Sequence, residues 1–147
     1  MPLLELLAQA DVVSLHCPLT SETQHMIDAA AIAGMKPGVV IVNTSRGALI
    51  DTEALIDGLK SRRIGAACLD VYEEESDLFY EDRSDSIIED DVLVRLISMP
   101  NVIVTSHQAF LTREALNNIA ATTVDNLLKF KRGEAAPDPE VCYRCAQ

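Results

Sequence analysis

The chain has 147 residues, of which 48% are hydrophobic, and this is enough for one modest domain with a buried core. Its 12 basic and 23 acidic residues give a net charge of −11, which argues against nucleic acid or an anionic membrane as the main partner. Ten of the acids lie between residues 73 and 91, where Arg83 is the one basic residue, so we expect an exposed acidic segment there.

The first residues, Met1 to Gln9, lack a basic leader, and Glu5 interrupts their apolar run. This pattern is typical of neither a signal peptide nor a membrane span, so we expect a cytoplasmic protein. The four cysteines are too dispersed for a disulfide framework. The pair Cys142 and Cys145 has no second pair or nearby histidine to complete a tetrahedral zinc site, and we expect no metal.

Apolar runs alternate with short amphipathic segments along the chain, which predicts strands and helices in turn. The expected strands are 12–17, 39–42, 64–69 and 102–105, and the expected helices are 3–10, 29–35, one that follows Asp51, 92–97, and one from Thr112 to about Arg132. Strands that alternate with helices pair in parallel through right-handed crossovers, so the predicted fold class is α/β. The polar tail, residues 134–147, is expected to be disordered.

The second strand, residues 39–42, consists of four β-branched apolar residues, which is typical of a strand buried on both faces of a parallel sheet. It runs into Thr44, Ser45 and Arg46, and ligands of open α/β sheets bind outside the carboxyl ends of the strands. The guanidinium of Arg46 is a planar, charged fork that suits a carboxylate or a phosphate. A surface arginine after a strand is the alternative.

Polar residues lie at or just after the carboxyl end of every predicted strand, namely His16, Arg46, Asp70 and His107, with glutamates at 73–75. Because parallel strands end at one edge of the sheet, these side chains are expected to converge. An arginine for an anionic substrate, a histidine that moves a proton and a carboxylate that holds the histidine would form an acid/base site. Taken singly, the histidine is compatible with an ordinary loop residue and each glutamate with a solvated one.

Four segments occur in order with fitting separations: ADVVSLHCPLTSET, MKPGVVIVNTSRGALID, LDVYEEE and NVIVTSHQAF. They resemble the successive signatures of the NAD-dependent D-isomer-specific 2-hydroxyacid dehydrogenases, and the match runs from about Leu3 to Gly133. Within that family, the segments DLFYED and HQAFLT resemble the D-lactate dehydrogenase branch. The resemblance implies an oxidoreductase that interconverts a D-2-hydroxy acid and its 2-oxo acid, most closely D-lactate and pyruvate, with NAD as cofactor.

The resemblance also implies roles for particular residues. Arg46 would bind the carboxylate and carbonyl of the 2-oxo acid. Glu75 would pair with His107, which would be the general acid in reduction and the general base in oxidation. The implied cofactor contacts are Cys17 and Pro18 beside the adenosine, Thr44, Ser45 and Arg46 at the nicotinamide ribose, Asp70 toward the carboxamide and, in addition, Thr23.

The chain contains six glycines, and none of them forms the G-x-G-x-x-G turn of a dinucleotide-binding fold. We therefore expect residues 1–133 to be the second half of a Rossmann-type doubly wound sheet with its C-terminal helix. The first half and the substrate domain would be absent, as in a C-terminal fragment.

Such a fragment is predicted to bind NAD weakly or not at all, and to be inactive alone. Its expected partners are the small 2-oxo or 2-hydroxy acid and a complementing N-terminal half or a second copy of the chain. The alternatives are a non-catalytic binding protein of the same fold and an interaction module that completes its sheet with another chain.

Overall fold

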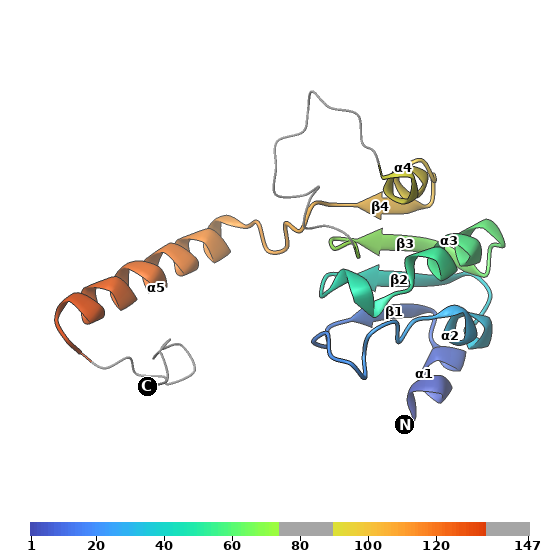
Figure 1. Ribbon diagram of the computed structural model, residues 1–147, viewed down its shortest axis with the longest axis horizontal. Helices are drawn as coiled ribbons and strands as arrows, with labels where there is room; N and C mark the ends of the chain where they lie inside the picture. The colour runs from blue at the N-terminus through green and yellow to red at the C-terminus, as the bar shows by residue number, and fades with distance from the viewer. Residues whose placement is uncertain (74–89, 135–147) are drawn as a thin grey trace. The chain divides into compact units, whose positions relative to one another are not determined.

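The computed structural model describes residues 1–73 and 90–134, and the chain divides into two compact units, Met1–Ala109 and Phe110 onward. The first unit contains four strands, β1 (Val12–Leu15), β2 (Val39–Asn43), β3 (Ile64–Leu69) and β4 (Val102–Val104). They form one parallel sheet in the order β1-β2-β3-β4 (Figure 1). The predicted α/β class is confirmed.

Each strand is joined to the next through a helix, and short polar side chains fix where most of these helices begin. The helices of the first unit are α1 (Leu3–Gln9), α2 (Ala29–Gly34), the 3-10 turn η1 (Gly47–Leu49), α3 (Thr52–Lys60) and α4 (Asp91–Ile97). Asp28, Asp51 and Asp90 each accept a hydrogen bond from a backbone N–H in the first turn of α2, α3 and α4. These caps satisfy donors that have no partner inside the helix.

The core lies on one face of this sheet. Along β1 and β2 the residues alternate, so that Val13, Leu15 and Ile41 are buried while Val40 and Val42 are half-buried. The expectation that β2 is buried on both faces is therefore not met within the described residues. Right-handed crossovers between strands in sequential order are expected to place the connecting helices on the same face. The half-buried state of Val40 and Val42 shows that the described residues of this unit cover the other face only in part.

The second unit contains α5 (Arg113–Lys131), which begins at Thr112, whose hydroxyl accepts from the N–H of Ala115. No residue of α5 is buried. The residue spacing predicts an inner stripe of Leu116, Ile119, Thr123 and Leu127 on this helix, and all four residues are exposed. Residues 135–147, where a disordered tail is predicted, lie outside the described residues. No helix in the described ranges combines the length and apolarity needed to cross a membrane.

Candidate active site

The carboxyl ends of the four strands lie at one edge of the sheet. Leu15 is paired with Asn43, Asn43 with Leu69, and Leu69 with Val104, so the strands end side by side (Figure 1). The polar residues that follow each strand therefore start from neighbouring positions, as the alternation of strands and helices predicts.

The segment after β1 is tied to the segment after β2. The hydroxyl of Ser45 donates to the carbonyl of Cys17 at 2.6 Å, and the Cys17 thiol lies 3.5 Å from the Met26 sulfur. The carbonyl of Pro18 accepts from the Thr23 hydroxyl at 2.7 Å. Four of the cofactor positions implied by the resemblance are thus connected. Ser45 donates to the Cys17 carbonyl and Thr23 donates to the carbonyl of the next residue, Pro18.

Asn43 shapes the turn that carries Arg46. Its side chain is 1% exposed, its amide nitrogen donates to the carbonyl of Arg46 at 2.8 Å, and its amide oxygen accepts from the N–H of Ser45 at 3.1 Å. Thr44 and the Arg46 side chain are exposed, and the guanidinium donates to the carbonyl of Ser45 at 2.7 Å. The sequence reasoning did not single out Asn43, although an amide at the end of a buried apolar strand is the signal that marks it.

Asp70 organises the segment after β4. Its carboxylate, on a residue only 6% exposed, accepts from the hydroxyl of Thr105 and from the N–H groups of Gln108 and Ala109 at 2.9 and 2.8 Å. Its carbonyl accepts from the N–H of His107 at 2.7 Å. Asp70 and His107, which the sequence places 37 positions apart, are therefore brought into direct backbone contact.

His107 has a φ of 50°, in the left-handed region that residues with a side chain seldom adopt. The three hydrogen bonds to the Asp70 carboxylate hold the turn around it in place. A backbone held in an unfavourable conformation by its surroundings is a common feature of functional sites.

Burial raises the pKa of Asp70, but the hydrogen bonds from Thr105, Ala109 and Gln108 and the nearby His107 together outweigh it, so the net pKa is below the ordinary value of 3.8. A carboxyl whose pKa is lower in the folded protein stabilises the fold at every pH above its unfolded value. That contribution is lost as the pH falls below about 3.8 through the folded pKa.

Replacing Asp70 with asparagine is expected to lower the free energy of unfolding by about 1–3 kcal/mol at neutral pH, because the amide NH₂ must face a backbone N–H. Urea unfolding at pH 7 and at pH 3 measures this, and the difference from the unsubstituted chain is expected to shrink at the lower pH. The control is Asp57→Asn on α3, where the side chain is 79% exposed and pairs with Lys60 at 3.5 Å. A difference for Asp70→Asn no larger than the control's would contradict this account.

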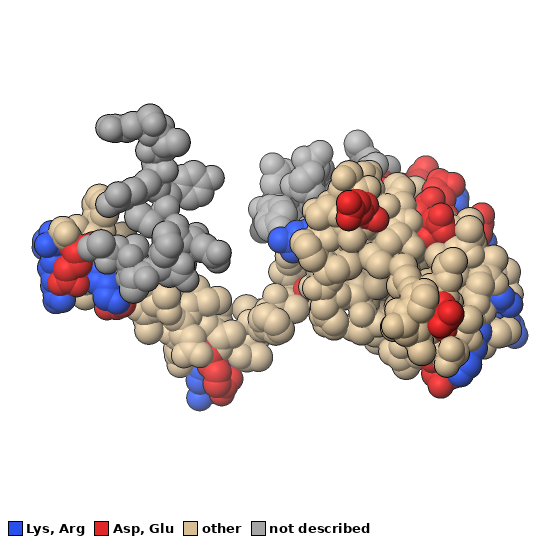
Figure 2. Space-filling view, turned by 90° about the horizontal axis from the view of Figure 1, so that it is seen from below, with Lys and Arg blue, Asp and Glu red and all other residues tan. Residues whose placement is uncertain are grey.

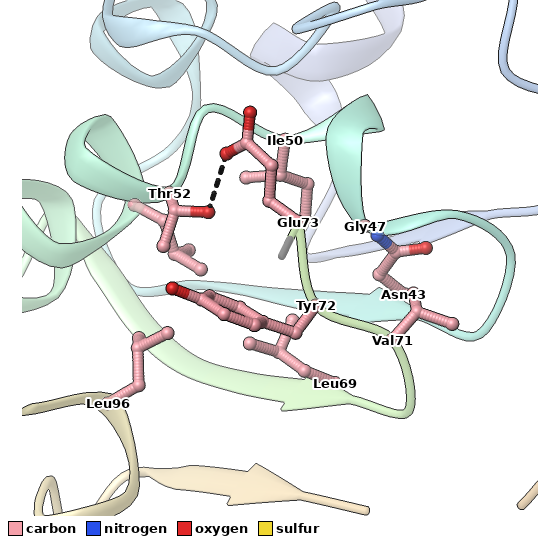
Figure 3. A pocket seen from close by; sticks show the side chains of 10 residues that line it. Asn43, Gly47, Ile50, Thr52, Leu69, Val71, Tyr72, Glu73 and Leu96 are labelled. Carbon is pink, nitrogen blue, oxygen red and sulfur yellow. Dashed lines mark hydrogen bonds between the residues drawn. The ribbon is translucent and has the colours of Figure 1, made fainter. Parts of the chain in front are cut away.

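A third cluster lies where the chain leaves β3 and was not found from the sequence. The carboxylate of Glu73 accepts from the Thr52 hydroxyl at 2.9 Å and contacts Nε2 of His25 at 2.6 Å. Figure 3 shows Glu73 beside Thr52, with the Tyr72 ring between Thr52 and Leu96, in a small, mostly apolar pocket. Glu75, the predicted partner of His107, lies outside the described residues.

An open parallel sheet with an arginine, a buried carboxylate and a histidine at its carboxyl edge has its polar groups where open α/β domains bind their ligands. The chain belongs to the D-isomer specific 2-hydroxyacid dehydrogenases, because residues 1–109 match the model of that family's NAD binding domain. NAD is accordingly the cofactor of this class of domain.

Similar proteins support the same assignment. The chain is 57% identical over 130 residues to a 2-hydroxyacid dehydrogenase homolog of Haemophilus influenzae, covering 88% of this chain and 39% of that protein. It is 54% identical over 133 residues to the D-lactate dehydrogenase of Escherichia coli, covering 90% and 40%. The D-lactate dehydrogenase of Treponema pallidum has a solved structure that superposes with a TM-score of 0.88 at 41% identity, covering 93% and 41%. The chain thus spans about 40% of the length of these relatives.

The described residues fit one end of NAD. Each carboxylate offers about four acceptor positions, and the Asp70 carboxylate accepts from three donors, which leaves capacity for one further N–H donor. The exposed hydroxyl of Thr44 and the exposed guanidinium of Arg46 are suited to a ribose. The pyrophosphate, by contrast, needs the N–H groups of a glycine-rich turn at the start of a helix, and the sequence contains no such motif.

Proposed function

We propose that this chain supplies the second half of the NAD-binding domain of an NAD-dependent D-2-hydroxyacid dehydrogenase, with D-lactate and pyruvate as the substrate pair. The observation that carries the proposal is the shared sheet edge, where Arg46 follows β2 while Asp70 and His107 are hydrogen-bonded to each other after β3 and β4. The likeness to D-lactate dehydrogenases supports the finer choice of substrate.

In this proposal each residue has a distinct task. The guanidinium of Arg46 binds the carboxylate of the 2-oxo acid through two parallel hydrogen bonds and fixes the orientation of its carbonyl. His107 donates a proton to the carbonyl oxygen as it becomes a hydroxyl, and Glu75 stabilises the charged imidazole. NADH, when bound, supplies the hydride to the carbonyl carbon.

For the cofactor we propose contacts from Cys17, Pro18, Thr23, Thr44, Ser45, Arg46 and Asp70. Those at 44–46 and at Asp70 serve the nicotinamide end, and those at Cys17 and Pro18 the adenosine end. Ser45, which donates to the Cys17 carbonyl, would hold the two groups of contacts in a fixed relation. We assign residues 1–133 to this partial domain with its C-terminal helix, and the remainder to a tail.

The edge of the sheet at β1 supports the proposal that another polypeptide segment completes this domain. β1 pairs on one side only, with β2, so the backbone groups of its other side lack a strand partner within the described residues. Val12 is 58% exposed and Leu4 of α1 69% exposed. α1 and β1 lie at the bottom of the unit in Figure 1, and the surface seen from that side in Figure 2 is largely uncharged. An N-terminal half of the domain would cover this surface, and a homo-oligomer is the competing way to cover it.

The test uses a chimera in which this chain replaces the matching 40% of the Escherichia coli D-lactate dehydrogenase. We expect the chimera to oxidise NADH when pyruvate is added, and the 147-residue chain alone to show no turnover and no saturable NADH binding. Turnover by the chain alone would overturn the proposal that it is only part of the active unit. Failure of a folded chimera, against an active parent enzyme, would overturn the proposed activity.

A further inference from the structure

The chain passes directly over Gly47 as it leaves β3. A Cβ atom placed on Gly47 would lie 2.1 Å from both the carbonyl carbon and the carbonyl oxygen of Tyr72, and 2.5 Å from the nitrogen of Glu73. The peptide bond between Tyr72 and Glu73 therefore lies against the Cα of the residue that follows Arg46. Only a residue without a side chain permits this approach.

The side chain of Glu73 holds the Tyr72–Glu73 peptide in this position through two contacts. One carboxylate oxygen accepts from the hydroxyl of Thr52 at 2.9 Å, as Figure 3 shows, and the other is 2.6 Å from Nε2 of His25. An ionised carboxylate only accepts hydrogen bonds, so the Nε2–H of His25 is the donor. The Glu73 side chain is 28% exposed and that of His25 38%, so the pair is partly shielded from water.

His25 closes a ring of contacts around the turn that follows Arg46. Its N–H donates to the carbonyl of Ala48 at 2.8 Å, and its φ of 50° directs the backbone into this bond. Next to it, Ile27 donates to the carbonyl of Leu49 at 3.1 Å. The segment before α2 thus holds the main chain of the 3-10 turn, while its histidine holds Glu73.

We propose that Glu73 is a positioning residue for Arg46, an inference that rests on the proposed function. The backbone of Arg46 is held from one side by the amide of Asn43 at 2.8 Å. After Arg46 the chain enters the turn η1. This turn is bonded to His25, and the Tyr72–Glu73 peptide, held through Glu73 by His25 and Thr52, packs on it. Glu73 is suited to this role because one carboxylate accepts from two donors on different segments, the hydroxyl at the start of α3 and the imidazole before α2.

Removing the carboxylate is expected to loosen the turn rather than the sheet. In the 147-residue chain, hydrogen exchange measured by NMR should report this, because the N–H groups of His25, Leu49 and Ile50 donate to carbonyls in the turn. We expect Glu73→Ala to speed exchange of these three amides about tenfold and to leave the amides between β1 and β2 unchanged. The matched control is Glu53→Ala, an exposed acid in the first turn of α3. Unchanged exchange at all three amides would overturn the proposal.

The same variants in the chimera test the consequence for catalysis. Displacement of the Arg46 guanidinium should raise the KM for pyruvate and lower kcat/KM for pyruvate by about 10- to 100-fold, with a smaller rise in the KM for NADH because Arg46 is also a proposed cofactor contact. Glu53→Ala should match the unsubstituted chimera. A merely structural role predicts lower thermal stability with unchanged kinetics below the transition, and that result would overturn the positioning role.

Two further outcomes are separable. If Glu73→Ala fails to fold, Glu73→Gln keeps an oxygen for Thr52 and is expected to give an intermediate exchange rate at the same amides; exchange identical to that of the unsubstituted chain would contradict the proposal. If the unsubstituted chimera has no turnover, the proposed function fails, while the exchange experiment still decides whether Glu73 holds the turn.

Discussion

Replacing His107 with asparagine in the chimera is expected to lower kcat for pyruvate reduction by about 10²- to 10⁴-fold, the usual effect of removing a positioned general acid. Asparagine is the most suitable replacement because His107 has a φ of 50°, and asparagine adopts a left-handed backbone more readily than most residues. The loss of the imidazole is thereby separated from a disturbance of the turn. Steady-state oxidation of NADH measures the effect.

The control for this prediction is Ser106→Ala, a neighbouring change that leaves the three hydrogen bonds to the Asp70 carboxylate in place. We expect it to retain kcat within a few-fold. If His107→Asn kept the kcat of the unsubstituted chimera, His107 would not be the proton donor, and the assignment of this sheet edge as the catalytic one would lose its main support.

Replacing Gly47 with alanine is expected to be the most damaging small change in the described chain. The added methyl group would lie 2.1 Å from the backbone of Tyr72, a position that no side-chain rotation relieves. Overpacking of this kind costs about 1–3 kcal/mol, and here it acts on backbone atoms, so we expect a loss of at least the upper value. Urea unfolding of the 147-residue chain measures it, and kcat/KM of the chimera should fall as well.

Gly34→Ala is the matched control, because no described atom beyond the adjoining backbone of α2 lies within 4 Å of a Cβ at that position, and the residue ends α2. There alanine should be neutral or stabilise the chain by about 0.4–1 kcal/mol, since it restricts the unfolded state without a clash. Equal stability for the two alanine variants would show that the segment after β3 does not pack on Gly47.

The sequence was sufficient where a local signal decides the outcome. Residues 64–69 were predicted as a strand and form β3. The helices predicted after Asp51 and from Thr112 begin at these two residues, whose side chains accept first-turn N–H groups. Each of these features depends on residues close by in the sequence, so it can be predicted from one sequence alone. The meeting of strand ends at one edge also followed, because parallel pairing imposes it.

Contacts between distant segments were not accessible in this way. Glu73 is one of three consecutive glutamates, and nothing in that run distinguishes the one that reaches His25, 48 positions earlier. The burial of β2 was overestimated for a related reason. A run of β-branched residues indicates a strand that can be covered on both faces, but among the described residues Val40 and Val42 are only half-buried.

The proposed function requires that this sheet edge directs the reduction of a 2-oxo acid by NADH to the D-hydroxy acid. The most direct test is the configuration of the lactate that the chimera forms from pyruvate, determined by chiral chromatography alongside the chimera that carries His107→Asn. We expect D-lactate from the first and almost none from the second. Formation of L-lactate, or equal amounts of D-lactate from both proteins, would contradict the account.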